Sequence, residues 1–106
     1  MDLGMERAAK IAIGNDVFRR CALRFTMTAG IQRLGDLPGL IEAVRDFDKF
    51  TEDNDPYREH DFGSLTWRGE EVFWKIDYYD RNLKYGSDPL DRHCKRVLTV
   101  MLASEY

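Results

Sequence analysis

The stretch 62–79, Phe-Gly-Ser-Leu-Thr-Trp-Arg-Gly-Glu-Glu-Val-Phe-Trp-Lys-Ile-Asp-Tyr-Tyr, decides the fold. It contains two runs of β-branched and aromatic residues on either side of Arg68-Gly69, and this pattern predicts a β-hairpin with a two-residue turn. Antiparallel pairing about that turn sets the register. The residues expected to face each other are Trp67 and Glu70, Leu65 and Val72, Gly63 and Trp74, and His60 and Asp77.

Strand alternation gives this hairpin two unlike faces. The face expected to join the core carries Leu65, Trp67, Val72, Trp74 and Ile76. Gly63 has no side chain and leaves space on that face beside the large indole of Trp74. The opposite face is expected to carry His60, Phe62, Phe73, Lys75, Asp77 and Tyr79.

The chain before the hairpin predicts helices and one strand. Helical spacing of apolar residues indicates an amphipathic helix over 5–21, with Gly14-Asn-Asp16 as a point where it could kink. Alternation over 23–28 predicts a half-buried strand. A second helix is expected from an N-cap at Asp36 to about Phe50, with Pro38 in its first turn, and the polar run 51–57 reads as a loop.

The chain after the hairpin is harder to interpret. A loop is expected after Asp80, and Asp88-Pro89 resembles a cap followed by a first-turn proline. We therefore expect a last helix from there, with 97–102 buried. The β-branched residues of 97–102 leave a central strand as the alternative.

These elements predict the α+β class, as a small antiparallel sheet built on a central β-hairpin and packed with two or three helices. The length of 106 residues suits a single domain over 1–106.

Composition limits the classes of function. No apolar run or N-terminal signal region points to a membrane, so we expect a cytoplasmic protein with no membrane partner. The net charge of −3 disfavours direct, broad contact with nucleic acid. Cys21 and Cys94 stand outside any paired spacing and are expected to be reduced thiols, and no cofactor is predicted.

Charge is unevenly distributed along the chain. The first quarter is basic, with Arg7, Lys10, Arg19, Arg20 and Arg24, and the middle is acidic, with Asp46, Asp48, Glu52, Asp53, Asp55, Glu59 and Asp61. Such a run is more often a solvated face than a partner site. As a binding surface, we single out Asp53, Asn54, Asp55, Glu59, Asp61, Trp74 and Tyr78.

The candidate catalytic group is His60 with Asp77 as its orienting carboxylate, flanked by Lys75 and Tyr79. A carboxylate that orients an imidazole is a general-base arrangement. A cross-strand His-Asp pair is also a common structural contact, and no Gly-x-Ser-x-Gly nucleophile motif accompanies it.

Metal binding remains open for the acidic cluster around His60. The calcium-loop template fails, because counting from Asp53 puts Tyr57 at position five and Arg58 at position six, where an oxygen ligand and a glycine are required. The structural alternative is that Asp53-Asn-Asp55 folds back on its own backbone and forms a tight turn before Pro56.

Three blocks together resemble a known bacterial family. They are Asp53-Asn-Asp-Pro with Glu59-His-Asp-Phe-Gly63, Val72-Phe-Trp-Lys-Ile-Asp-Tyr-Tyr-Asp80, and Arg96-Val-Leu-Thr-Val-Met-Leu-Ala-Ser-Glu-Tyr106. The family is catalogued as domain of unknown function (DUF) 3768. The resemblance implies a small cytosolic protein of a kind often carried on plasmids and other mobile DNA, and it implies no activity.

Two hypotheses of function follow. The first is a non-enzymatic accessory or regulatory module that binds a protein partner through the acidic 46–61 segment and nearby aromatics, and that acts on a host nucleic-acid-handling complex by occupying a basic site. The alternative is a small hydrolase or metal-assisted enzyme with His60 as general base and Asp77 as its orienter.

Overall fold

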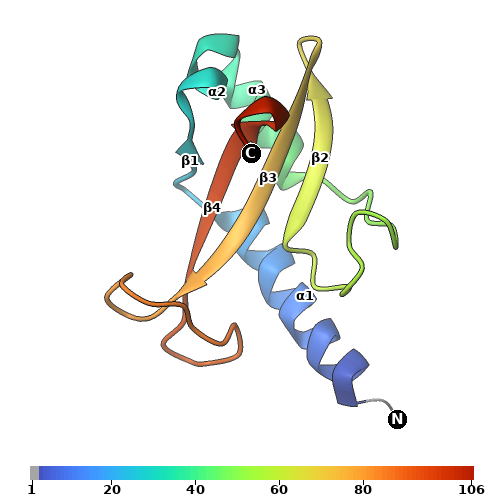
Figure 1. Ribbon diagram of the computed structural model, residues 1–106, viewed down its shortest axis with the longest axis vertical. Helices are drawn as coiled ribbons and strands as arrows, with labels where there is room; N and C mark the ends of the chain where they lie inside the picture. The colour runs from blue at the N-terminus through green and yellow to red at the C-terminus, as the bar shows by residue number, and fades with distance from the viewer. Residues whose placement is uncertain (1–2) are drawn as a thin grey trace.

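The computed structural model describes residues 3–106 and contains one four-stranded sheet with helices packed against it (Figure 1). The strands are β1 (Thr26–Met27), β2 (Phe62–Trp67), β3 (Glu70–Tyr79) and β4 (Lys95–Leu102), in the order β1-β4-β3-β2. The helices are α1 (Leu3–Cys21), α2 (Ala29–Leu34), α3 (Leu37–Arg45) and the short 3-10 helix η1 (Ala103–Glu105). The α+β prediction is confirmed. The sheet is mixed rather than antiparallel, because β1 runs parallel to β4.

The hairpin has the predicted turn and register from Trp67–Glu70 to Gly63–Trp74. Arg68 and Gly69 have φ values of 50° and 82°, and positive φ at both central residues is what a type I′ turn requires. Strand pairing with β3 begins at Phe62, so the position of His60 is not set by the register.

The core lies between the sheet and the helices. It contains Ile31, Leu40, Val44, Phe47, Val72, Trp74, Ile76, Leu98 and Val100. The predicted role of Gly63 is confirmed, because a Cβ at this position would lie 2.3 Å from Nε1 of the fully buried Trp74.

The helices differ from their predicted limits in informative ways. α1 is continuous through Gly14, where a Cβ would lie 2.8 Å from Nη2 of Arg96, so the glycine permits close approach rather than a kink. Asp36 caps α3 as predicted and accepts a hydrogen bond from the Gly39 N–H (3.2 Å), but the helix ends at Arg45. The strand predicted over 23–28 is only the two residues of β1, and α2 was not predicted.

The prediction of a final helix was wrong. Residues 95–102 form β4, which pairs with β3 on one side and β1 on the other. Leu98 and Val100 are buried on the core side and Met101 is also buried, as expected for an inner strand with both faces partly covered. Asp88 forms a local turn by accepting the Leu90 N–H (2.8 Å) and does not start a helix.

Within residues 3–106, no helix combines the length and apolar character needed to cross a membrane.

Candidate functional site

The acidic segment 46–61 connects α3 to β2 without regular structure, and Asp55 organises its second half. The Asp55 side chain is 5% exposed, and its Oδ1 accepts the N–H groups of Glu59 (3.1 Å) and His60 (3.2 Å). Arg58 and His60 both have positive φ, at 58° and 56°. The buried carboxylate therefore holds a tight turn in which two non-glycine residues adopt the left-handed conformation.

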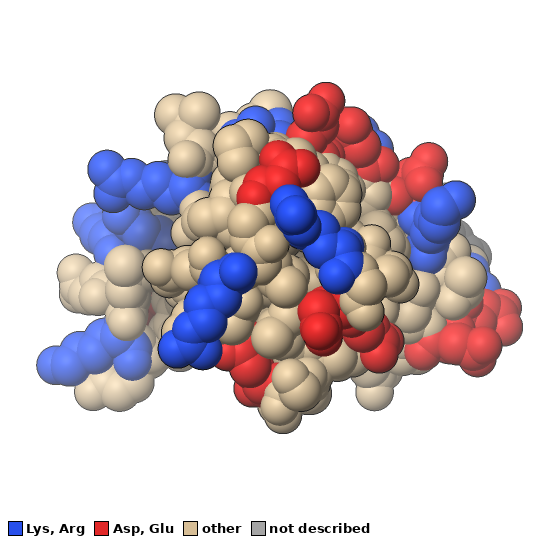
Figure 2. Space-filling view, turned by 90° about the horizontal axis from the view of Figure 1, so that it is seen from above, with Lys and Arg blue, Asp and Glu red and all other residues tan. Residues whose placement is uncertain are grey.

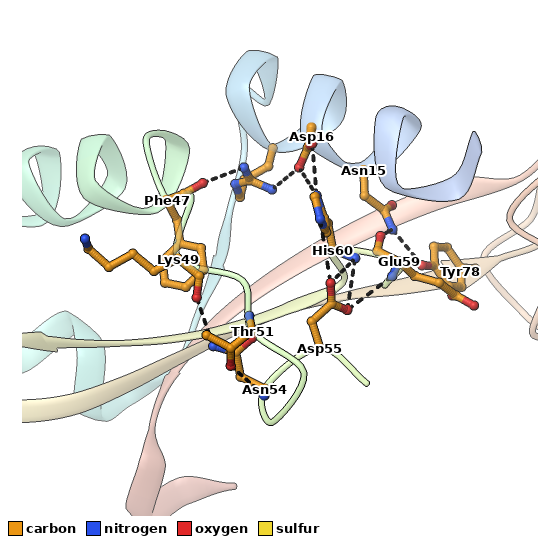
Figure 3. Close-up of polar contacts among 11 residues, drawn as sticks. Asn15, Asp16, Phe47, Lys49, Thr51, Asn54, Asp55, Glu59, His60 and Tyr78 are labelled. Carbon is orange, nitrogen blue, oxygen red and sulfur yellow. Dashed lines mark hydrogen bonds and ion pairs between the residues drawn. The ribbon is translucent and has the colours of Figure 1, made fainter. Parts of the chain in front are cut away.

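His60 ties this turn to α1 (Figure 3). Its Nδ1 lies 3.0 Å from both carboxylate oxygens of Asp16, and its Nε2 lies 3.7 Å from Oδ2 of Asp55. The ring stacks on Phe50, with centroids 3.8 Å apart and planes at 1°. Because a carboxylate oxygen only accepts, Nδ1 is the donor to Asp16, and Nε2 has no close hydrogen-bond partner within residues 3–106.

The structure does not bring His60 and Asp77 together. Asp77 instead contacts Lys75, with Oδ2 and Nζ 3.0 Å apart, and this hydrogen bond raises the pKa of Lys75. Lys75, Asp77 and Tyr79 alternate along β3 with core residues such as Ile76, so they lie on the opposite face of the sheet. The predicted alternation stops before His60, whose positive φ turns its ring toward the helices.

Arg19 is a buried part of this site that the sequence reasoning did not single out. Its side chain is fully buried, and it donates to the carbonyl oxygens of Val44 (3.0 Å) and Phe47 (2.9 Å) and to Asp16 (3.0 Å). The guanidinium lies over the Trp74 ring, and burial lowers the pKa of Arg19. Asp16 thus joins a buried arginine to the histidine of the loop.

A second network next to His60 starts from Asn15, which is also fully buried. Its Nδ2 donates to the carbonyl oxygen of Glu59 (2.9 Å) and to the hydroxyl oxygen of Tyr78 (2.8 Å), and its Oδ1 accepts from Nε of Arg96 (2.7 Å). Burial raises the pKa of Tyr78 to about 12. The phenol is therefore neutral at physiological pH and acts here as a fixed hydrogen-bonding group.

The residues singled out for binding fall into different environments. Trp74 is fully buried, so it cannot touch a partner in this fold. Asn54 builds a turn by donating to the carbonyl oxygen of Lys49 (3.0 Å) and accepting the Thr51 N–H (2.9 Å). Asp53 is exposed, and Glu59 and Asp61 are partly buried. Across residues 3–106, no group of three or more His, Cys, Asp or Glu side chains is arranged to hold a metal ion.

Two hollows meet at Arg58 and His60. One, of ≈ 550 Å³, runs between the turn and the N-terminal half of α1 and is lined largely by apolar groups, including Met5, Ile13 and Tyr57. The other, of ≈ 370 Å³, is lined by Phe50, Thr51, Glu52, Asp55, Arg58 and His60. Tyr57 is 79% exposed at the rim of the first hollow. The site is thus an open surface beside a firmly held turn.

Charged side chains of the two signs are unevenly distributed on the face shown in Figure 2. In the view of Figure 2, Asp and Glu side chains gather toward the right, the side on which segment 46–61 lies in Figure 1, and Lys and Arg side chains gather toward the left.

We expect Asp61→Asn to stabilise the protein at neutral pH. Burial raises the pKa of Asp61, so the folded state favours its protonated form, and the ionised form is penalised. The penalty is absent at pH values below the unfolded-state pKa and develops as the pH rises through the higher folded-state pKa. Urea unfolding at several pH values should therefore show that Asp61→Asn gains no stability over the unmodified protein near pH 3 and its full gain in free energy of unfolding at pH 7. A gain that is equal at both pH values would contradict this assignment.

The fold and site define an α+β protein whose irregular acidic segment is fastened to its first helix by a buried polar network. The family described as protein of unknown function (DUF3768) matches residues 27–105, and the chain belongs to that family. No curated protein and no solved structure matches the chain.

Proposed function

We propose that the protein is a non-enzymatic accessory or regulatory module that binds another protein, and that segment 46–61 is its docking surface. The observation that carries the proposal is that exposed carboxylates stand on a segment held in one conformation. Asp46, Asp48, Glu52 and Asp53 are exposed. Asn54 holds this part of the segment through Lys49 and Thr51, and Asp55 and His60 fix the turn that follows. A surface that is already ordered loses little conformational entropy on binding.

The chemistry of the surface indicates its partner. An exposed tyrosine beside an apolar hollow is typical of the centre of a protein interface, and the surrounding carboxylates would form its polar rim. Carboxylates favour a partner with a basic face through complementary charge. Basic faces are typical of proteins that handle nucleic acid. The partner class that we propose is therefore a nucleic-acid-handling complex of a bacterial host, which a protein encoded on mobile DNA would encounter there.

We expect the double substitution Glu52→Lys/Asp53→Lys to weaken partner binding by about tenfold, because it replaces attraction by repulsion at exposed positions. The only ion pair it removes among the described residues is the long contact between Glu52 and Arg58 (3.7 Å), and such an exposed pair contributes little to stability. The measurement is quantitative co-purification and cross-linking from a native host, followed by titration of the recovered partner.

The matched control is Glu42→Lys/Glu70→Lys, which makes the same change in net charge at exposed positions outside the segment. Equal recovery with both double variants, or recovery of no partner by the unmodified protein, would remove the support for this function.

The alternative of a small hydrolase or metal-assisted enzyme rests on one observation, an imidazole oriented by a carboxylate beside two hollows. Asp16 would take the orienting role first assigned to Asp77. Hydrolysis of model esters or phosphoesters that is lost in His60→Gln, in protein that remains folded, would favour the enzyme over the binding module.

A further inference from the structure

β2 is an edge strand with an unpaired side. It pairs with β3 alone among the described residues. The N–H of Ile76 donates to the carbonyl oxygen of Asp61 (2.8 Å), which makes residues 61, 63, 65 and 67 the hydrogen-bonded positions toward β3. The N–H and C=O groups of Phe62, Ser64 and Thr66 therefore point outward.

The residues of this edge include none of the types that block pairing with another chain. Proteins protect exposed edges with proline, lysine or charged inward-facing residues. The sequence Phe-Gly-Ser-Leu-Thr-Trp of β2 contains no such residue. The edge can accept a further strand.

A groove of ≈ 400 Å³ lies beside this edge. It is lined by β2 from Ser64 to Trp67, by Ala43 of α3, and by residues 46–49 at the start of the acidic segment. The charged residues among them are Asp46, Asp48 and Lys49, so the carboxylates outnumber the single cation. A strand added to β2 would direct every second side chain toward the helix side of the sheet, where this groove lies. The groove and the free edge together provide side-chain and main-chain contacts for the same ligand.

Trp67, one of the residues that line the groove, carries a buried and unpaired donor. The indole Nε1–H of Trp67 is shielded from solvent and has no acceptor among residues 3–106. Buried polar groups in folded proteins nearly always have a partner, and the free energy cost of leaving one unpaired is about 1–3 kcal/mol.

We infer that the β2 edge binds an extended segment of a partner protein as a fifth strand, with a lysine or arginine of that segment directed toward Asp46 and Asp48. This inference rests on the proposed protein-binding function and specifies how the partner is bound. A second copy of this chain fits less well, because the six residues of β2 include no lysine or arginine that could be directed toward these carboxylates.

The test uses random twelve-residue peptides displayed on phage and selected against the whole protein. We expect selected peptides to be rich in β-branched and basic residues and to bind Thr66→Pro about tenfold more weakly, because proline removes the outward N–H of the edge. Thr66→Val is the matched control, since it keeps the N–H and the β propensity and should bind as the unmodified protein does. Hydrogen exchange of the Ser64 and Thr66 amides should slow when a selected peptide is added.

An independent variant guards against misfolding of Thr66→Pro. Asp46→Lys/Asp48→Lys leaves the strand unchanged and should weaken binding of the same peptides, while Glu42→Lys/Glu70→Lys should not. Proline is tolerated at outward positions of edge strands, so circular dichroism should report a folded Thr66→Pro protein.

Three results would overturn the inference. One is selected peptides that bind Thr66→Pro and the unmodified protein equally, and another is no selection of peptides at all. The third is a dimer of the unmodified protein in sedimentation that Thr66→Pro abolishes, which would assign the edge to a second copy. If binding depends on Glu52 and Asp53 but not on Thr66, the protein-binding function stands and the edge pairing fails.

Discussion

Arg19→Met should destabilise the protein by about 3–5 kcal/mol, the range found when one partner of a buried ionic network is removed. The side chain is fully buried, and its guanidinium donates to two carbonyl oxygens and to Asp16. Methionine fills part of the volume but donates nothing, so the carbonyls of Val44 and Phe47 lose the bonds that Arg19 makes to them. Urea unfolding followed by circular dichroism measures the loss directly.

Two further variants separate this effect from a general effect of charge. Arg20→Met removes an arginine from the same turn of α1, but that side chain is exposed, so we expect a change within about 0.5 kcal/mol. Arg19→Lys should remain strongly destabilised, because an ammonium group cannot reproduce the planar fork that reaches three acceptors. A loss below about 1 kcal/mol in Arg19→Met would show that these contacts do not hold α1 to the fold.

The local sequence was sufficient to predict the turn and the register of the hairpin. A two-residue turn fixes the register of the strands around it, so Arg68-Gly69 placed Gly63 opposite Trp74 without knowledge of the rest of the fold. The N-cap at Asp36 was predictable for the same reason, since the capping interaction spans only three residues.

The C-terminal strand was not predictable with the same certainty. An inner strand is apolar on more than one face, and so is a buried helix. The spacing of apolar residues over 97–102 therefore does not distinguish a strand from a helix. In the fold, this segment becomes an inner strand because it also pairs with β1, which lies some seventy residues earlier in the chain and is only two residues long. Such long-range pairing leaves little trace in the local pattern.

The candidate site was only partly predictable. The sequence indicated that Asp53-Asn-Asp55 forms a turn, and the structure has Asn54 and Asp55 bonded to the backbone. The orienting partner of His60 was assigned by extending strand alternation past Phe62, which a positive φ at His60 interrupts. Non-glycine residues rarely adopt that conformation, and although histidine does so more often than most residues, its presence alone does not predict it.

Gly63→Ala is expected to destabilise the protein by about 3 kcal/mol, at the upper end of the usual cost of adding a methyl group to a packed core. The added Cβ would lie 2.3 Å from Nε1 and 2.5 Å from Cε2 of Trp74. The indole has no free space to move into, because it is fully buried between Phe47 and the guanidinium of Arg19. A shift of the ring would therefore also disturb the network that fastens α1 to the acidic segment.

A double-mutant cycle with Trp74→Phe tests whether this contact is the cause. Phenylalanine is smaller and lacks the atoms nearest to the added Cβ, so Gly63→Ala should be less costly in the Trp74→Phe background than alone. The free energies of unfolding from urea titrations of the four proteins give the coupling. Purely additive losses would contradict the steric explanation and would trace the requirement for glycine at position 63 to the backbone of the β2 edge instead.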